Sequence, residues 1–178
     1  MQSLSKFILF KLWGWSIEGE YPKGVHKFVT IAAPHTHWLD FPLGILFRNA
    51  VGLDIKFLAK ASLFKGPFGW FFKMTGGFPV ERSKSTNKVD TIVNIFNENK
   101  EFMLALSPEG TRQKVTTWKT GFYHIAAGAG VPIILVTFDF QHKVLKISKP
   151  IYPSDFDKDM QTINEFYRGV IGKVPEYS

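Results

Sequence analysis

One stretch of sequence decides the fold class: FVTIAAPHTHWLD, from Phe28 to Asp40. Its first six residues form a short apolar run, which is typical of a strand buried on both faces of a sheet. Pro34 ends the run, and polar residues follow at once. Pro42 then stands in the first turn of a predicted helix over residues 41–52, a position that proline favours. A buried strand that leads through a polar loop into a helix indicates an α/β protein.

The rest of the chain continues this alternation of strands and helices. Further strands are predicted at 55–59, 77–81, 102–106 and 131–140, the last of them pairing with residues 144–148. Helices are predicted at 83–99, at 121–130 and from Asp155 to Ile171, and an apolar helix with a narrow basic edge at 1–15. We therefore expect one α/β domain over residues 1–178, a layered sheet of mostly parallel strands flanked by helices.

The composition is that of a globular protein that binds anions. A chain of 178 residues with 45% hydrophobic and 21% charged residues is the size of one domain, and this composition excludes disordered, collagen-like and coiled-coil architectures. The net charge of +7 attracts phosphate esters, nucleic acid or acidic lipid headgroups. The absence of cysteine excludes disulfides, zinc ribbons and thiol nucleophiles.

Aromatic residues, 18 of them Phe, exceed what a core of this size needs, so we expect some to be exposed at a membrane interface or against bases. The longest apolar runs are too short to span a bilayer, and the N-terminus lacks the pattern of a signal peptide. We expect a cytoplasmic protein, held peripherally on the inner face of the membrane by anionic lipid. The expected contacts are the rings of residues 7–15 and 68–72, flanked by Lys6, Lys11, Lys65 and Lys73. The alternative is that these rings fill the core.

Candidate catalytic residues follow the first strand. His35 and Asp40 are five residues apart, which on a regular helix would separate their side chains by about 140°. They can meet only if the chain turns between them. In that geometry the carboxylate holds one imidazole nitrogen and leaves the other free as a general base. The alternative is that His35 and Asp40 are polar loop residues with no shared role.

The spacing of His35 and His37 also invites a metal interpretation. Metal-dependent hydrolases with an HxHxDH run have one residue between the second His and the Asp, whereas Trp38 and Leu39 intervene here. Because the chain has no cysteine and only three other histidines, we expect no metal site.

Two more polar blocks adjoin predicted strands. Residues 76–82 combine two glycines, which let the backbone approach a ligand, with Arg82, which can bind phosphate. Residues 107–112 place Glu109 and Arg112 in a loop that can offer charge and backbone N–H groups to an anion, and Lys119 adds a cation downstream. The alternatives are ordinary turns, or a structural pair between Glu81 and Arg112.

The order of these blocks resembles that of the 1-acylglycerol-3-phosphate acyltransferases, within the broader glycerophospholipid acyltransferase family. That family has His-x4-Asp, then Gly-x4-Arg, then Pro-Glu-Gly-Thr-Arg, then Val-Pro-Ile. The matching residues here are His35 to Asp40, Gly77 to Arg82, Pro108 to Arg112, and Val131 to Ile133. Together with a similar lead-in at residues 17–22, the resemblance covers residues 13–150.

The resemblance implies a fold like that of glycerol-3-phosphate acyltransferase and acyl transfer to a lysophospholipid, most simply 1-acylglycerol-3-phosphate. It implies that His35 is the general base and that Asp40 orients it. The residues it implies in substrate binding are Gly77, Arg82, Glu109, Gly110, Thr111, Arg112 and Lys119. The donor would be an acyl thioester of coenzyme A or of acyl carrier protein, a substrate, and no cofactor is expected.

The chain departs from the family pattern in the catalytic loop. Pro34 and His37 stand where the family often has Asn and Ser, and Ser107 stands where Phe is commoner. These differences leave open a related acyltransferase that acts on another lysophospholipid or on an amino-acid-linked lipid. Outside enzymes, the rivals are a catalytically silent lipid-surface protein and a nucleic-acid-binding module. Against the latter, the cations are scattered, so we expect no nucleic-acid partner.

Overall fold

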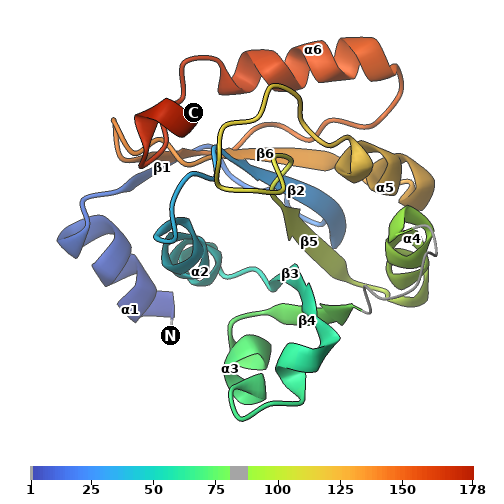
Figure 1. Cartoon of the computed structure of the whole chain (residues 1–178), viewed down its shortest axis with the longest axis horizontal. Helices are drawn as coiled ribbons and strands as arrows, with labels where there is room; N and C mark the ends of the chain where they lie inside the picture. Colours follow the sequence, from blue (N-terminus) through green and yellow to red (C-terminus); the bar gives the residue numbers. More distant parts are fainter. Residues whose placement is uncertain (1, 81–87) are drawn as a thin grey trace.

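A five-stranded sheet forms the centre of the computed structural model, which describes residues 2–80 and 88–178. The strand order is β4-β3-β5-β2-β6, and each neighbouring pair is parallel (Figure 1). The strands are β2 (Lys27–Ala33), β3 (Ile55–Lys60), β4 (Gly77–Val80), β5 (Phe102–Leu106) and β6 (Ile133–Thr137). The predicted α/β class with mostly parallel strands is confirmed.

Helices cover both faces of this sheet (Figure 1). One face carries α1 (Gln2–Lys6), a π-helical segment (Phe7–Leu12) and α2 (Asp40–Val51). The opposite face carries α4 (Lys88–Glu98), α5 (Gly121–Ala129) and α6 (Phe156–Tyr167). Between β3 and β4 the chain makes an excursion through a 3₁₀ turn (Ala61–Phe64) and α3 (Gly69–Met74), and a second 3₁₀ turn (Pro175–Tyr177) lies near the C-terminus.

Alternate residues of the central strands supply two separate cores. In β6, Ile133 and Leu135 pack with α4, α5 and α6, whereas Ile134 and Val136 pack with the π-helical segment and α2. All four side chains are fully or almost fully buried. Each such side chain contributes roughly 1.5–3 kcal/mol when it leaves water. Burial on both faces explains why this strand, like β2, is apolar without alternation.

The chain leaves β2 and β5 toward opposite faces of the sheet. After β2 it enters α2 on one face, and after β5 it leads to α5 on the other. The two strands are parallel neighbours, with Ile31 opposite Leu106, so their carboxyl ends border one crevice. Such a point, where connections diverge, is where open α/β sheets bind ligands. The loops at residues 34–39 and 107–120 therefore meet there.

The predicted pairing of residues 131–140 with 144–148 is confirmed in part, since antiparallel bridges join Val136 to Ile147 and Asp139 to Val144. The strand β7 (Val144–Lys146) forms its ladder with β1 (Ser16–Glu18), in a separate parallel pair, and touches the β6 segment only through isolated bridges. Asp139 and Val144 exchange two backbone hydrogen bonds at 3.1 Å, and side chains add to these. The hydroxyl of Thr137 accepts from the Lys146 N–H at 3.0 Å, and the hydroxyl of Ser148 accepts from the Leu135 N–H at 2.9 Å.

The last helix begins as predicted but ends early. The Asp155 side chain caps its first turn by accepting from the Lys158 N–H at 3.2 Å. The helix stops at Tyr167, and Gly169 follows with φ +76°, a left-handed conformation that commonly terminates helices. Val170 and Ile171, expected in the helix, therefore lie in the segment that follows it.

The N-terminal residues are helical only through Leu12, and their aromatic rings divide between surface and core. Phe7 is exposed, whereas Trp15 is buried edge-on against Phe140 at a centroid distance of 4.9 Å. The expectation that Trp15 contacts a membrane is wrong. In the described part of the chain, no helix has the length and apolar character required to cross a bilayer.

Candidate active site

The loop between β2 and α2 brings His35 and Asp40 together. Asp40 is the first residue of α2, and the chain turns so that Nδ1 of His35 lies 3.0 Å from Oδ2 of Asp40. A carboxylate can only accept, so Nδ1 carries the proton and Nε2 is free to accept another. The His35 side chain is 26% exposed and that of Asp40 only 1%. The predicted contact is confirmed, with a partly accessible imidazole and a shielded carboxylate.

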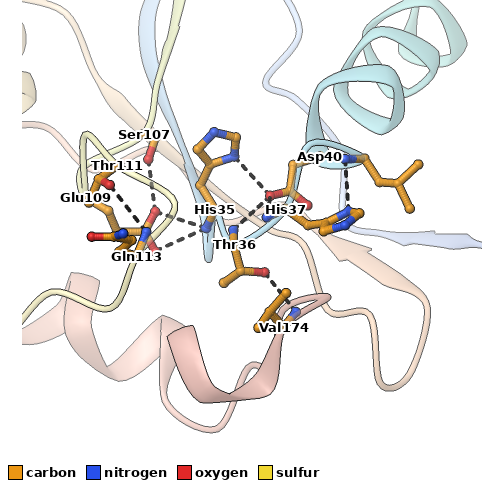
Figure 2. A network of polar contacts seen from close by, with 10 residues as sticks. His35, Thr36, His37, Asp40, Ser107, Glu109, Thr111, Gln113 and Val174 are labelled. Atoms are coloured by element: carbon orange, nitrogen blue, oxygen red, sulfur yellow. Dashed lines mark hydrogen bonds and ion pairs between the residues drawn. The ribbon is translucent and has the colours of Figure 1, made fainter.

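Backbone groups fix the Asp40 carboxylate in place. The same Oδ2 accepts from the N–H groups of Thr36 and His37, both at 2.8 Å (Figure 2). Three donors therefore converge on one oxygen, and they set the direction of the carboxylate toward the imidazole. Among the described residues none donates to Oδ1 of Asp40, although this atom is buried.

Glu109 holds the catalytic loop from the neighbouring loop. Its carboxylate oxygens lie 3.1 and 3.0 Å from the backbone N–H of His35, which donates to them, and the Ser107 hydroxyl donates at 2.9 Å (Figure 2). Glu109 is only 7% exposed. Burial raises the pKa of its carboxyl, an effect that the hydrogen bonds from His35 and Ser107 oppose without cancelling.

Exposed basic side chains follow Glu109. Gly110 adopts φ +66°, and a Cβ at this position would lie 2.5 Å from Nζ of Lys119, so the lysine packs directly against the glycine. Arg112 is exposed and lines the same cavity as His35. The Thr111 hydroxyl accepts locally from the Gln113 N–H at 3.3 Å. This loop therefore presents positive charge beside the catalytic pair.

A largely apolar cavity runs from His35 beneath α2. About 210 Å³ of it is accessible to the centre of a water molecule, which is below the range of roughly 300–1,000 Å³ typical of ligand pockets. The residues that line it are Tyr21, Thr30, Ala32, His35, Asp40, Phe41, Gly44, Ile45, Phe47, Arg48, Ile55, Lys56, Phe57, Ala105, Leu106, Ser107, Arg112, Val136 and Phe138. Its shape suits an apolar ligand with a reactive group at one end.

The strand register gives the length of this cavity. Ile55 lies beside Met103, which lies beside Phe28, five residues before the end of β2. At about 3.3 Å per residue, the cavity reaches roughly 17 Å along the sheet from the catalytic loop to Ile55.

The far end of the cavity is polar. Nε of Arg48 donates to the Ile55 carbonyl at 2.8 Å, while Asp54 pairs with Arg48 and with Lys56. The deep wall holds Tyr21, the pKa of whose phenol is raised by burial, within 3.4 Å of the Thr30 hydroxyl.

Comparisons with known proteins agree with this geometry. Residues 17–139 match the Acyltransferase family model, a span that includes the catalytic loop, the cavity and the Glu109 loop. The chain belongs to the acyltransferase family. It is 29% identical over 134 residues to a 1-acyl-sn-glycerol-3-phosphate acyltransferase of Escherichia coli, and 31% identical over 173 residues to one of Saccharomyces cerevisiae.

These relatives are longer than the present acyltransferase chain. The matches cover 72% and 84% of this chain but 54% and 55% of the two relatives, so it spans about half the length of the curated proteins it matches. The 1-acyl-sn-glycerophosphate acyltransferase PlsC of Thermotoga maritima has a similar fold, with a TM-score of 0.66 and 22% identity over 95% of this chain and 76% of that chain.

Not every residue of the acyltransferase motifs lies at the catalytic loop. Gly77 begins β4, and a Cβ there would lie 2.7 Å from the Phe72 carbonyl and 3.0 Å from Cζ of Phe64. Gly77 therefore permits close packing against α3, and the expectation that it binds substrate is not supported. Arg82 and Glu81 lie outside the described residues.

Glu109 also differs from its expected role in the acyltransferase site. It was expected to bind the acceptor, but both oxygens face the backbone of His35, and it lines a different cavity from His35. A motif shows that a carboxylate is present in a loop, whereas its direction depends on a contact 74 residues away in sequence.

The sequence did not predict the cavity wall, because its residues are mostly apolar and scattered over five elements. The one local signal was Gly44, a glycine in the middle of a helix. A Cβ there would lie 3.7 Å from Cζ of Phe138 across the cavity. The second histidine of the loop is engaged locally, since Nδ1 of His37 accepts from the Leu39 N–H at 3.2 Å. Within residues 2–80 and 88–178, no three metal-ligating side chains cluster.

Proposed function

We propose that this chain transfers a fatty acyl group from an acyl thioester to the free hydroxyl of a lysophospholipid, with 1-acylglycerol-3-phosphate as the acceptor and phosphatidic acid as the product. One observation carries the proposal: the His35–Asp40 pair lies at one end of a long apolar cavity whose lining also includes Arg112. The reaction requires a general base, an apolar channel for the acyl chain and a cation for the phosphate of the acceptor.

Proton transfer is assigned to His35. Its free Nε2 accepts the proton of the acceptor hydroxyl as the oxygen attacks the thioester carbonyl carbon. The carbon–sulfur bond then breaks, and the proton passes from Nε2 to the departing thiolate. Asp40 stabilises the imidazolium between these steps through its 3.0 Å contact with Nδ1. No covalent enzyme intermediate is required.

Positioning is assigned to the cavity and to the basic loop. The fatty acyl chain occupies the apolar space beneath α2, which brings its carbonyl to His35. Arg112 and Lys119, together with Arg82 on the evidence of its motif, bind the phosphate of the acceptor. Holding both reactants in place supplies proximity, which is a large part of such a rate enhancement. The thioester is already activated, so the reaction needs no cofactor.

Contact with a membrane surface follows from the lipid substrates. Phe68 and Trp70 are 68% and 64% exposed, beside Lys65 and Lys73. Figure 1 places α1 and α3 on the same side of the sheet as α2, and α2 forms one wall of the cavity. We propose that this side rests on anionic lipid at the cytoplasmic face of the membrane, because rings enter the headgroup region while lysines attract its charge.

The deciding experiment is thiol release from acyl-coenzyme A in the presence of a panel of lysophospholipids. The chain contains no cysteine, so a thiol reagent reports only the donor. We expect release that depends on 1-acylglycerol-3-phosphate, with phosphatidic acid identified by mass spectrometry. Acyl carrier protein as an alternative donor is tested in the same way, by the mass of its phosphopantetheine arm.

Other outcomes have distinct readouts. Release with another lysophospholipid or an amino-acid-linked lipid alone would keep the reaction and change the acceptor. Binding to vesicles without release would indicate a catalytically silent lipid-surface protein. Steeply salt-dependent binding to oligonucleotides without release would indicate a nucleic-acid-binding module.

A further inference from the structure

The segment after α6 lies against the catalytic loop. Residues 170–178, the C-terminal strap, are anchored where the Phe140 N–H donates to the Ile171 carbonyl at 2.8 Å. Within the strap, the Gly172 N–H donates to the Ser178 hydroxyl at 2.8 Å. From this position the Val174 N–H donates to Oγ1 of Thr36 at 3.1 Å (Figure 2). The strap therefore reaches a residue that lies next to His35 in the chain.

Gly172 makes this approach possible. A Cβ on Gly172 would lie 2.6 Å from Oγ1 and 2.8 Å from Cγ2 of Thr36, and 3.1 Å from Cγ of Pro34. Its φ is not left-handed, so the backbone itself would accept alanine without strain. The glycine is needed for space alone, and an added methyl group must displace either the strap or the catalytic loop.

Thr36 connects the strap to the catalytic pair. The residue is 3% exposed, and its backbone N–H donates at 2.8 Å to Oδ2 of Asp40, the oxygen that also contacts Nδ1 of His35. The side chain of Thr36 thus holds the strap while its backbone directs Asp40. A movement of Thr36 changes the direction of the carboxylate and hence of the imidazole.

We propose that Thr36, Gly172 and Val174 form a positioning contact through which the C-terminal strap fixes the loop that carries His35 and Asp40. None of the three touches the reacting atoms. The structural claim stands on the contacts above, and its kinetic consequence rests on the proposed acyl transfer. A misplacement of about 1 Å can lower a rate by on the order of 10²-fold, so small movements of this loop are costly.

The kinetic test uses Gly172→Ala, Thr36→Val and Thr36→Ser. We expect Gly172→Ala and Thr36→Val to lower kcat about tenfold or more with both KM values within twofold, because binding residues are untouched. Thr36→Ser keeps the hydroxyl and should recover most of the rate. The matched control is Gly121→Ala, where an added Cβ meets no atom within 4 Å and φ is not left-handed. We expect it to behave as the unaltered chain.

Hydrogen exchange tests the contact without any substrate. In Gly172→Ala and Thr36→Val, the amides of Thr36 and His37 should exchange about tenfold faster or more, while those of β6 stay protected. Unchanged exchange in both variants would overturn the positioning contact, as would a Thr36→Ser rate no better than that of Thr36→Val. If the unaltered chain shows no acyl transfer, the proposed function fails, and exchange alone then decides the role of the strap.

Discussion

Both carboxylate oxygens of Glu109 lie within 3.1 Å of the backbone nitrogen of His35, although the two residues are 74 positions apart in sequence. The acid of the Pro-Glu-Gly-Thr-Arg block thereby supports the backbone at His35. Because β2 and β5 are parallel neighbours, their following loops are fixed side by side, and Glu109 uses this proximity.

Replacing Glu109 should separate this role from acceptor binding. We expect Glu109→Gln to lower kcat about tenfold while the acceptor KM stays within twofold, because the substitution displaces His35 and no acceptor ligand. Steady-state kinetics with varied acceptor measure both. A tenfold rise in acceptor KM at constant kcat would instead make Glu109 an acceptor ligand.

The stability of the same variant should depend on pH in a defined direction. Burial raises the pKa of the Glu109 carboxyl above its ordinary value of 4.5, so the folded state favours the protonated form. The contribution of the protonated Glu109 carboxyl to the stability of the fold is complete below pH 4.5 and declines as the pH rises through the raised pKa. The unaltered chain should therefore lose stability relative to Glu109→Gln over that interval. Denaturant unfolding at several pH values measures the difference, and an unaltered chain that gains stability relative to Glu109→Gln as the pH rises would refute the assignment.

Removing the base should abolish transfer. His35→Ala is expected to lose about 10²-fold or more of kcat, the scale of general-base catalysis. Asp40→Asn should also lose most activity. The control is His26→Ala, since His26 precedes β2 at the opposite edge of the sheet and its side chain is 59% exposed. More than about a tenth of the rate remaining in His35→Ala would reject the mechanism.

Arg112→Ala should weaken binding of the acceptor more than that of the donor. A lost charge-assisted hydrogen bond is worth roughly 1.5–3 kcal/mol, which corresponds to a rise in acceptor KM of about tenfold or more. Arg82→Ala is expected to act similarly, from its place in the motif. Lys114→Ala is the matched control, because Lys114 is exposed in the same loop but does not line the cavity. Equal effects on donor and acceptor would assign Arg112 to another role.

Filling the cavity at Gly44 should change the preferred acyl chain. Gly44 faces Phe138 across the space, so Gly44→Leu shortens the apolar channel. We expect rates with long-chain donors to fall about tenfold while short-chain donors are used as before, which makes the donor series its own control. A uniform loss at all chain lengths would mean that the acyl chain lies elsewhere.

Membrane contact should depend on the exposed rings of the α3 excursion. The chain is expected to sediment with vesicles that contain anionic lipid and to be released by salt. Phe68→Ser and Trp70→Ser should weaken this binding, whereas Tyr152→Ser, with a ring of similar exposure that precedes α6, should not. Equal binding to neutral vesicles would contradict the proposed surface.

Patterns local to the sequence predicted most of the fold. The apolar run of β2 and the cap of Asp155 depend on neighbouring residues, and both were found. The ladder of β7 with β1 was not predicted, because β1 lies more than 120 residues earlier in the chain. The side-chain bonds of Thr137 and Ser148 likewise depend on tertiary neighbours.

The candidate site divides in the same way. The contact between His35 and Asp40 depends on a turn within one loop, which their spacing left open and the family resemblance implied. The direction of Glu109, the packing of Gly77 and the contact of Thr36 with Val174 all depend on tertiary neighbours. The spacing of the motifs carries no information on these three tertiary contacts.

Anyone who redesigns this acyltransferase faces a constraint set by α2. Asp40 opens this helix, and one turn later Gly44 lies in the wall of the cavity. A mutation library aimed at new acyl chains would, if confined to α2, alter the same helix that carries Asp40. The rings of Phe57 and Phe138 line the same channel from outside that helix, so they are the safer positions to diversify when chain preference is to change and turnover is to be kept.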